Sequence, residues 1–159
     1  MTNADVSATR EIHRIGQRDQ AMMVPRAVPN APGLFLVDST WGAISPMQLA
    51  LGVCTVGELE VIDHIKQDLP LVDTRSESFY RDGSIPGARN IPHDTISEAI
   101  PSLDSAGATI FFCNGPQCEA TPSSIATLRR AGYPAKAILY YRGGVHDWIT
   151  LGLPLLRPA

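Results

Sequence analysis

The stretch from Thr109 to Ser124 reads Thr-Ile-Phe-Phe-Cys-Asn-Gly-Pro-Gln-Cys-Glu-Ala-Thr-Pro-Ser-Ser. It begins with an apolar run typical of a buried β-strand, and that run ends at Cys113. The residues Asn-Gly-Pro at 114–116 favour a tight turn. Thr121 followed by Pro122 predicts the cap and first turn of a helix. The sequence therefore predicts a strand, a loop that opens at a cysteine, and a helix.

The position of Cys113 at the start of this loop has chemical consequences. Loop amides and the first N–H groups of a helix have no partners within the helix, and together they favour an anion. A cysteine in such a cradle is expected to have a lowered pKa and to be a good nucleophile at neutral pH. The alternative interpretation is a small buried apolar residue, because cysteines at strand ends often have that role.

The chain has 159 residues, of which 44% are hydrophobic and 18% are charged. These values predict one globular domain with an extension, and no apolar run approaches the length needed to span a membrane. Residues 1–20 are polar and lack the apolar segment of a secretory signal, so a cytoplasmic location is expected. The net charge of −3, without a basic cluster, does not support nucleic-acid binding.

The three cysteines are Cys54, Cys113 and Cys118. An odd number in a chain without a secretory signal argues against a framework of structural disulfides and favours thiol chemistry or burial. The spacing of Cys113 and Cys118, without a second cysteine pair, is not typical of a zinc site. We therefore expect no metal.

Residues 1–50 differ from the remainder, and we interpret them as an extension that precedes a domain at 51–159. Residues 7–20 are compatible with a short polar helix, several prolines interrupt the segment that follows, and 34–37 predicts a short strand. The apolar side chains of the extension, including Trp41, are too many for a free tail. They predict packing on the body of the protein or on a second subunit.

From residue 52 onward, strand and helix patterns alternate. Strands are expected at 53–55, 69–72, 109–112 and 137–141, with a short strand within 85–92, and helices at 76–81, 97–103, 122–131 and 145–151. A capping box formed by Thr55 and Glu58 predicts a further helix, with Leu59, Ile62 and Ile65 on one face. Cys54 is expected in the core, and Trp148 against the sheet.

This alternation predicts an α/β fold with a central parallel sheet flanked by helices on both faces. Ligands of such sheets bind outside the carboxyl ends of the strands. Asp73 and Arg75 follow one expected strand, and Cys113 follows another. All three are therefore expected to line that rim.

Four segments in order resemble the rhodanese (sulfurtransferase) domain family over residues 53–158. They are Leu-Val-Asp-Thr-Arg at 71–75, Gly-Ser-Ile-Pro-Gly-Ala-Arg-Asn-Ile-Pro at 83–92, Phe-Cys at 112–113 with its loop and helix, and Tyr-Arg-Gly-Gly at 141–144 with Trp148. The resemblance implies that Cys113 is the catalytic residue. It also implies an active-site loop of Asn114, Gly115, Pro116, Gln117 and Cys118, with Asp73, Arg75, Arg142 and Gly143 in support.

The chain departs from the family pattern at two places. Ser84 stands where the family usually has histidine, at a position that is generally structural. The loop ends in Cys118 and Glu119, whereas many members have Arg, Lys or Thr there and so favour anionic sulfur donors. Its six residues match sulfur-handling members, while related phosphatases have an extra residue and a closing arginine. Phosphatase activity is therefore disfavoured, and His93 and His146 are interpreted as surface or packing residues.

The resemblance implies a thiosulfate or persulfide sulfurtransferase that needs no cofactor. Cys113 would carry a sulfane sulfur as a persulfide, from a small or protein donor to a thiol or to cyanide. Glu119, a further supporting residue close to the loop, is expected to disfavour dianionic thiosulfate as the donor. The alternative is that its carboxylate only satisfies the dipole at the helix start. A membrane partner is not expected, whereas a protein sulfur partner and a homo-oligomer are left open.

Two other functions remain open at this stage. One is a non-catalytic or regulatory binding module that keeps the fold and senses a ligand or a partner. The other is a thiol redox protein that uses Cys113 and Cys118. Cys118 itself is interpreted either as a thiol that resolves a persulfide on Cys113 or as a packing residue below the following helix.

Overall fold

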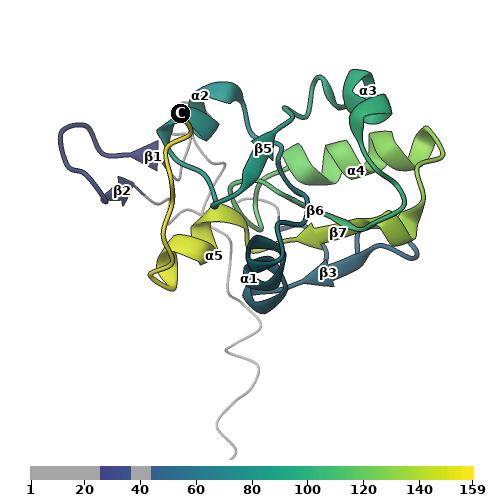
Figure 1. Ribbon diagram of the computed structural model, residues 1–159, viewed down its shortest axis with the longest axis horizontal. Helices are drawn as coiled ribbons and strands as arrows, with labels where there is room; N and C mark the ends of the chain where they lie inside the picture. The colour runs from purple at the N-terminus through teal and green to yellow at the C-terminus, as the bar shows by residue number, and fades with distance from the viewer. Residues whose placement is uncertain (1–25, 37–43) are drawn as a thin grey trace, which may run out of the picture.

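The computed structural model describes residues 26–36 and 44–159. Its centre is a parallel sheet of five strands in the order β3-β7-β6-β4-β5 (Figure 1). The strands are β3 (Cys54–Val56), β4 (Leu71–Asp73), β5 (Ala88–Asn90), β6 (Thr109–Phe112) and β7 (Ile138–Tyr141). The α/β fold expected from the sequence is thus confirmed.

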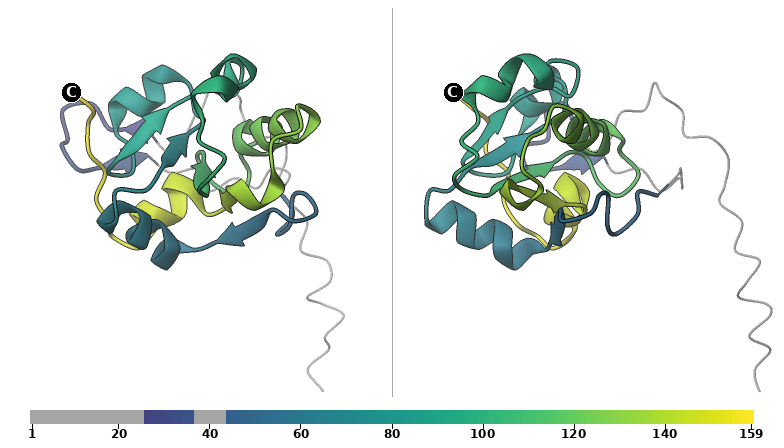
Figure 2. Two further views of the ribbon diagram at one scale, coloured as in Figure 1. Left: turned by 45° about the vertical axis from the view of Figure 1, so that its right-hand side comes forward. Right: turned by 90° about the vertical axis from the view of Figure 1, so that its right-hand side faces the viewer.

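Helices follow the strands, as a parallel sheet requires. They are α1 (Glu58–Lys66), α2 (Glu77–Asp82), α3 (Ile96–Ala99), α4 (Ala120–Arg130) and α5 (Gly144–Thr150), with short 3₁₀ turns at Ile100–Ser102 and Ala135–Ala137. Figure 2 shows α1 and α4 on opposite sides of the sheet. Among the described residues, no helix is long and apolar enough to cross a membrane.

The core consists of two layers, one on each face of the sheet. In β6 the side chains alternate between these layers: Phe111 packs with α3 and α4, whereas Ile110 and Phe112 pack on the opposite face with α1 and α5. All four residues of β6 are buried because the strand lies in the middle of the sheet. Trp148 is buried in the second layer, as expected from the sequence.

Two segments before the sheet contact the body of the protein. Strands β1 (Arg26–Ala27) and β2 (Phe35–Leu36) form an antiparallel pair, and β1 lies near α2 (Figure 1). Further along the chain, Leu49 and Ala50 pack against the core layer that contains Phe111. The helix expected at residues 7–20 lies outside the described residues.

Two sequence expectations near β3 are wrong. Cys54 is exposed, and it lies at the start of β3, an edge strand of the sheet. Helix α1 is capped by Gly57, whose amide donates to the Glu60 carboxylate at 2.8 Å, and not by the pair Thr55 and Glu58. Of the three residues expected on the packing face of α1, Ile62 and Ile65 do pack against the core, whereas Leu59 is 75% exposed. The fully buried residues of the helix are Val61 and His64.

Candidate active site

The parallel pairing of β4 and β6 brings their carboxyl ends together. Asp73 lies opposite Phe112 in register, so the residues that follow, Thr74 and Cys113, leave the sheet side by side. The Thr74 amide donates to the Phe112 carbonyl at 2.9 Å, and the Thr74 hydroxyl donates to the same carbonyl at 3.1 Å. The start of the cysteine loop is therefore held by the strand next to it.

The sulfur of Cys113 lies in a buried and partly polar environment. Cys113 is only 2% exposed. Both the backbone amide and the hydroxyl of Thr121, in the first turn of α4, hydrogen-bond to the Cys113 thiol. The Thr121 hydroxyl in turn lies 2.8 Å from the Thr74 hydroxyl. The Cys118 carbonyl accepts a hydrogen bond from Cys113 Sγ at 3.6 Å.

The lowered pKa expected for Cys113 is wrong for this conformation. Burial raises the pKa of the Cys113 thiol well above its usual value, and the neighbouring Cys118 thiol raises it further. The two hydrogen bonds from Thr121 act in the opposite direction, because they favour the thiolate, but they are outweighed. The sequence pattern correctly indicates the helix amide, but it contains no information about how deeply the sulfur is buried.

The loop from Cys113 to Cys118 curls back on itself. The Cys118 amide donates to the Gly115 carbonyl at 3.0 Å and closes a turn around Pro116 and Gln117. Asn114 is buried, and its Oδ1 has no hydrogen-bond partner among the described residues. The Pro116 carbonyl accepts a hydrogen bond from the Ser45 amide at 2.7 Å. The loop is thus fixed by a residue that precedes the whole sheet.

The other side of the loop is held by the start of α5. The amides of Val145 and His146 donate to the carbonyls of Cys113 and Asn114, at 3.0 and 2.7 Å. This contact requires glycine at position 144, where φ is +60° and an added Cβ would lie 2.4 Å from the Cys113 carbonyl oxygen. The amides at this helix start therefore bind loop carbonyls, not an anion.

The other three predicted supporting residues are Arg142, Gly143 and Glu119. The Arg142 Nε donates to the Ser45 carbonyl at 2.8 Å, and the Gly143 carbonyl accepts from the Asp147 amide at 3.2 Å. Glu119 is exposed and occupies the cap position of α4. The sequence assigns that cap to Thr121, which is wrong. Thr121 is the second residue of α4, and its hydroxyl hydrogen-bonds to the Thr74 hydroxyl.

Asp73 and Arg75 form a buried ion pair beside the loop. The Asp73 carboxylate accepts from Arg75 Nη2 at 2.6 Å, from Arg75 Nε at 3.0 and 3.1 Å, and from the Ser84 hydroxyl at 2.8 Å. Arg75 also donates to the Gly83 carbonyl at 2.8 Å. The pair thus connects the end of β4 to the turn after α2. Ser84, at the position of the usual family histidine, takes part in this network.

The polar triplet at 73–75 is expected at the rim from the sequence, and Thr74 does lie there against the start of the loop. Sequence reasoning misses three other residues that the structure brings to the loop: Thr121, Ser45 and His146. His146 lies over Gly115, and its Nδ1 is 3.1 Å from the Asp147 carboxylate. Ser45 gives no local signal, because it reaches the loop only through the tertiary fold.

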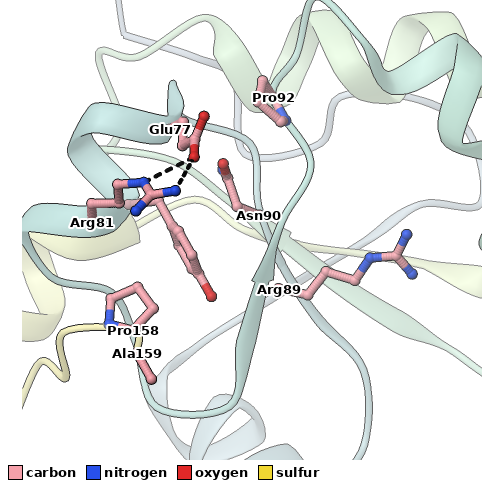
Figure 3. Close-up of a pocket in the computed structure, with 8 residues that line it drawn as sticks. Glu77, Arg81, Arg89, Asn90, Pro92, Pro158 and Ala159 are labelled. Carbon is pink, nitrogen blue, oxygen red and sulfur yellow. Dashed lines mark hydrogen bonds and ion pairs between the residues drawn. The ribbon is translucent and has the colours of Figure 1, made fainter.

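A separate pocket with a volume of about 470 Å³ lies between α2, β5 and the segment at Pro158 (Figure 3). It contains none of the predicted site residues. Arg81 pairs with Glu77 there, and Arg89 donates to the Ser102 hydroxyl at 2.6 Å, so both arginines already have partners. Within residues 26–36 and 44–159, no three His, Cys, Asp or Glu side chains gather where they could hold a metal ion.

The fold and the site define a class of protein: a parallel α/β domain in which a cysteine at a strand end opens a loop that leads into a helix. The family model of the rhodanese-like domain matches residues 58–151. The chain belongs to the rhodanese-like domain family.

Solved structures agree with this assignment at the level of the fold. The thiosulfate sulfurtransferase of Pseudomonas aeruginosa is 24% identical with a TM-score of 0.54, over 67% of this chain and 21% of that one. The rhodanese-like domain of the Alr3790 protein from Anabaena sp. is 24% identical with a TM-score of 0.55, over 65% of this chain and 79% of that one. The BH2092 protein of Bacillus halodurans is 22% identical with a TM-score of 0.57, over 64% of this chain and 75% of that one.

One relative carries the name of a different kind of protein. The chain is 31% identical over 88 residues to the HTH-type transcriptional regulator Rv0324 of Mycobacterium tuberculosis. The match covers 55% of this chain but only 38% of the regulator. The chain thus spans well under half of the length of that relative.

Proposed function

We propose that this protein is a sulfurtransferase that carries a sulfane sulfur as a persulfide on Cys113. The observation that supports this proposal most directly is the position of the Cys113 sulfur, against the amide and hydroxyl of Thr121 at the start of α4. Hydrogen bonds from fixed donors stabilise a developing sulfur anion without reorganisation during the reaction. The family assignment supports the same chemistry.

The proposed reaction has two steps. The Cys113 thiolate attacks the sulfane sulfur of the donor, the bond to the donor remnant breaks, and the remnant leaves with the electron pair. A thiol, or cyanide, then attacks the outer sulfur of the persulfide and releases the Cys113 thiolate. Because burial raises the pKa of Cys113, the first step requires the thiol to lose its proton as the donor arrives.

The first prediction is therefore a sulfur adduct on Cys113. After incubation with inorganic polysulfide or thiosulfate, the intact mass of the wild-type protein is expected to increase by one sulfur atom, and Cys113→Ser is expected to show no increase. The rate of adduct formation should rise from neutral to alkaline pH, because the thiolate fraction grows as the pH approaches the raised pKa. An adduct that persists in Cys113→Ser, or a wild-type protein in which the Cys113 thiol stays unmodified throughout, would contradict the proposal.

The second prediction concerns the choice of donor. Glu119 is exposed at the cap of α4, and its charge would repel dianionic thiosulfate approaching the loop. Because exposed charges interact by less than about 1 kcal/mol, we expect Glu119→Gln to raise thiosulfate turnover by about two- to fivefold. A neutral organic trisulfide should be unaffected as donor. Steady-state kinetics at low and high salt measure the difference.

A matched control for this variant is Asp63→Asn. Asp63 is exposed on α1, which packs on the opposite face of the sheet from α4. Asp63→Asn removes one negative charge, as Glu119→Gln does, but on the other side of the sheet from α4. If Glu119→Gln and Asp63→Asn change thiosulfate turnover equally, only the net charge of the protein matters and Glu119 has no specific role in donor choice.

A regulatory binding module is the second candidate, and the curated relative favours it. That relative is named a transcriptional regulator, and in the present conformation burial suppresses the thiolate of Cys113. A sensing module would accept one sulfur atom and transfer it slowly. Many turnovers per Cys113 with a thiol acceptor would exclude this role, whereas one equivalent of persulfide without turnover would favour it.

A further inference from the structure

The two cysteines of the loop lie against each other, although four residues separate them in the chain. The turn closed between Gly115 and Cys118 folds the loop back, so that the Cys118 carbonyl oxygen is 3.6 Å from Cys113 Sγ. Standard bond lengths then place the Cys118 Cα within about 6 Å of that sulfur. The Cys118 side chain itself hydrogen-bonds to the Cys113 thiol. Contact between the two sulfurs therefore requires no rearrangement of the fold.

The two thiols differ in their access to solvent. Cys113 is 2% exposed, whereas Cys118 is half-buried at the outer end of the loop. A thiol dissolved in water therefore reaches the sulfur of Cys118 more easily than the sulfur of Cys113. This asymmetry gives the pair a buried end, where sulfur would be bound, and an accessible end, where a reductant could act.

We propose that Cys118 is a second catalytic residue, which resolves the persulfide on Cys113 and releases its sulfur as sulfide. This inference rests on the proposed function, because it requires that Cys113 first carries a sulfane sulfur. It extends that function, because the protein then reduces sulfane sulfur in addition to transferring it. It also assigns a role to the cysteine that replaces the usual Arg, Lys or Thr at the end of the loop.

The step balances without any outside oxidant. The Cys118 sulfur attacks Cys113 Sγ, the bond between Sγ and the outer sulfur breaks, and the electron pair of that bond moves to the outer sulfur. The outer sulfur takes the proton of the Cys118 thiol and leaves as HS⁻. The sulfane sulfur is thereby reduced to sulfide, and the two cysteines are oxidised to a Cys113–Cys118 disulfide.

The disulfide is returned to the reduced state by a dithiol. One thiolate of the dithiol attacks the accessible Cys118 sulfur, and the Cys113 thiolate leaves. The second thiol of the reductant then attacks the mixed disulfide, forms its own disulfide and releases the Cys118 thiolate. Until a dithiol arrives, the protein holds no nucleophilic thiol in the loop and accepts no further sulfur.

The experiment compares the full chain as wild type, Cys118→Ser and Cys54→Ser, each treated with inorganic polysulfide in the absence of oxygen. Unreacted polysulfide, which itself yields sulfide, is first removed by rapid desalting. Intact mass is then followed with time, sulfide released by the protein is measured by a colorimetric assay, and cysteine links are mapped in peptides. Cys54→Ser is the matched control, because Cys54 is exposed on β3 and takes no part in the loop.

In the wild type we expect the added sulfur atom to be lost, with release of one equivalent of sulfide, loss of two hydrogen atoms relative to the starting protein, and a Cys113–Cys118 link that dithiothreitol removes. Cys118→Ser should keep the persulfide about tenfold longer. Cys54→Ser should match the wild type. The mapped link tests the proposal even if Cys118→Ser folds poorly.

Equal persulfide lifetimes in the wild type and Cys118→Ser, without a Cys113–Cys118 link, would overturn the resolving role and leave the sulfurtransferase proposal intact. Absence of an adduct on Cys113 in both proteins, with the two thiols unlinked in the wild type, would overturn the sulfurtransferase proposal and the resolving role with it. The two failures are thus distinguishable in one experiment.

Discussion

Replacement of Arg75 by methionine is expected to lower the free energy of unfolding by about 3–5 kcal/mol, because it leaves the buried Asp73 carboxylate without its ion partner. Asp73 is 0% exposed and Arg75 is 3% exposed, so water cannot replace the lost donors. The Ser84 hydroxyl and the backbone amide at position 75 would remain, at 2.8 and 3.0 Å. Urea unfolding followed by circular dichroism measures the loss.

The same substitution at Arg81 is the control. Arg81 pairs with Glu77 at 2.5 Å, but the two side chains are 71% and 64% exposed. Such exposed pairs stabilise a protein by less than about 1 kcal/mol, so Arg81→Met should change the stability very little. A loss of similar size in the two variants would show that burial does not set the strength of the Asp73–Arg75 interaction.

Replacement of Gly144 by alanine is expected to displace the cysteine loop and to reduce the rate of persulfide formation by about 100-fold. An added Cβ would lie 2.4 Å from the Cys113 carbonyl oxygen, 2.7 Å from the Gly115 nitrogen and 2.8 Å from the Asn114 carbonyl carbon. All three are backbone atoms of the loop, so no flexible side chain can move away. The reaction rate with polysulfide and the unfolding midpoint both measure the effect.

Gly132→Ala provides the matched control for this variant. Gly132 also has a positive φ, +82°, but an added Cβ would meet no atom within 4 Å. The substitution should therefore cost about 1 kcal/mol of stability through the backbone alone and leave the chemistry unchanged. If Gly144→Ala reacts as fast as Gly132→Ala, the contact between α5 and the loop does not position Cys113.

The strand that ends at Cys113 is predictable from the sequence because its signal is local. The apolar run of β6 is buried on both faces of the sheet. The Asn-Gly-Pro residues at 114–116 favour a turn and so end the strand pattern. The same reasoning locates Asp73 and Arg75 at the end of β4. Side chains at the carboxyl ends of parallel strands are expected to meet, and Asp73 does lie opposite Phe112.

The remaining features depend on tertiary contacts between segments far apart in the chain, which no local sequence pattern predicts. Cys54 follows a strand pattern, but its exposure depends on β3 lying at the edge, and the order of strands is set by the whole fold. The pKa of Cys113 depends on burial beneath other parts of the chain, which outweighs the helix amide that the sequence indicates. Ser45 and His146 reach the loop from elements far from it in sequence.

The hydrogen bonds of Ser45, the pairing of β3 and the bridge of Leu156 all involve residues outside the span that matches the family model. Residues 58–151 exclude β3, which pairs with β7, and exclude Leu156, which bridges to Ser84. They also exclude Ser45, which joins Pro116 to Arg142. An excised piece with those limits would present β7 as a bare edge, open to pairing with other chains. A piece that keeps all three of these contacts extends from Ser45 to Leu156 and is thus wider than the span of the family match.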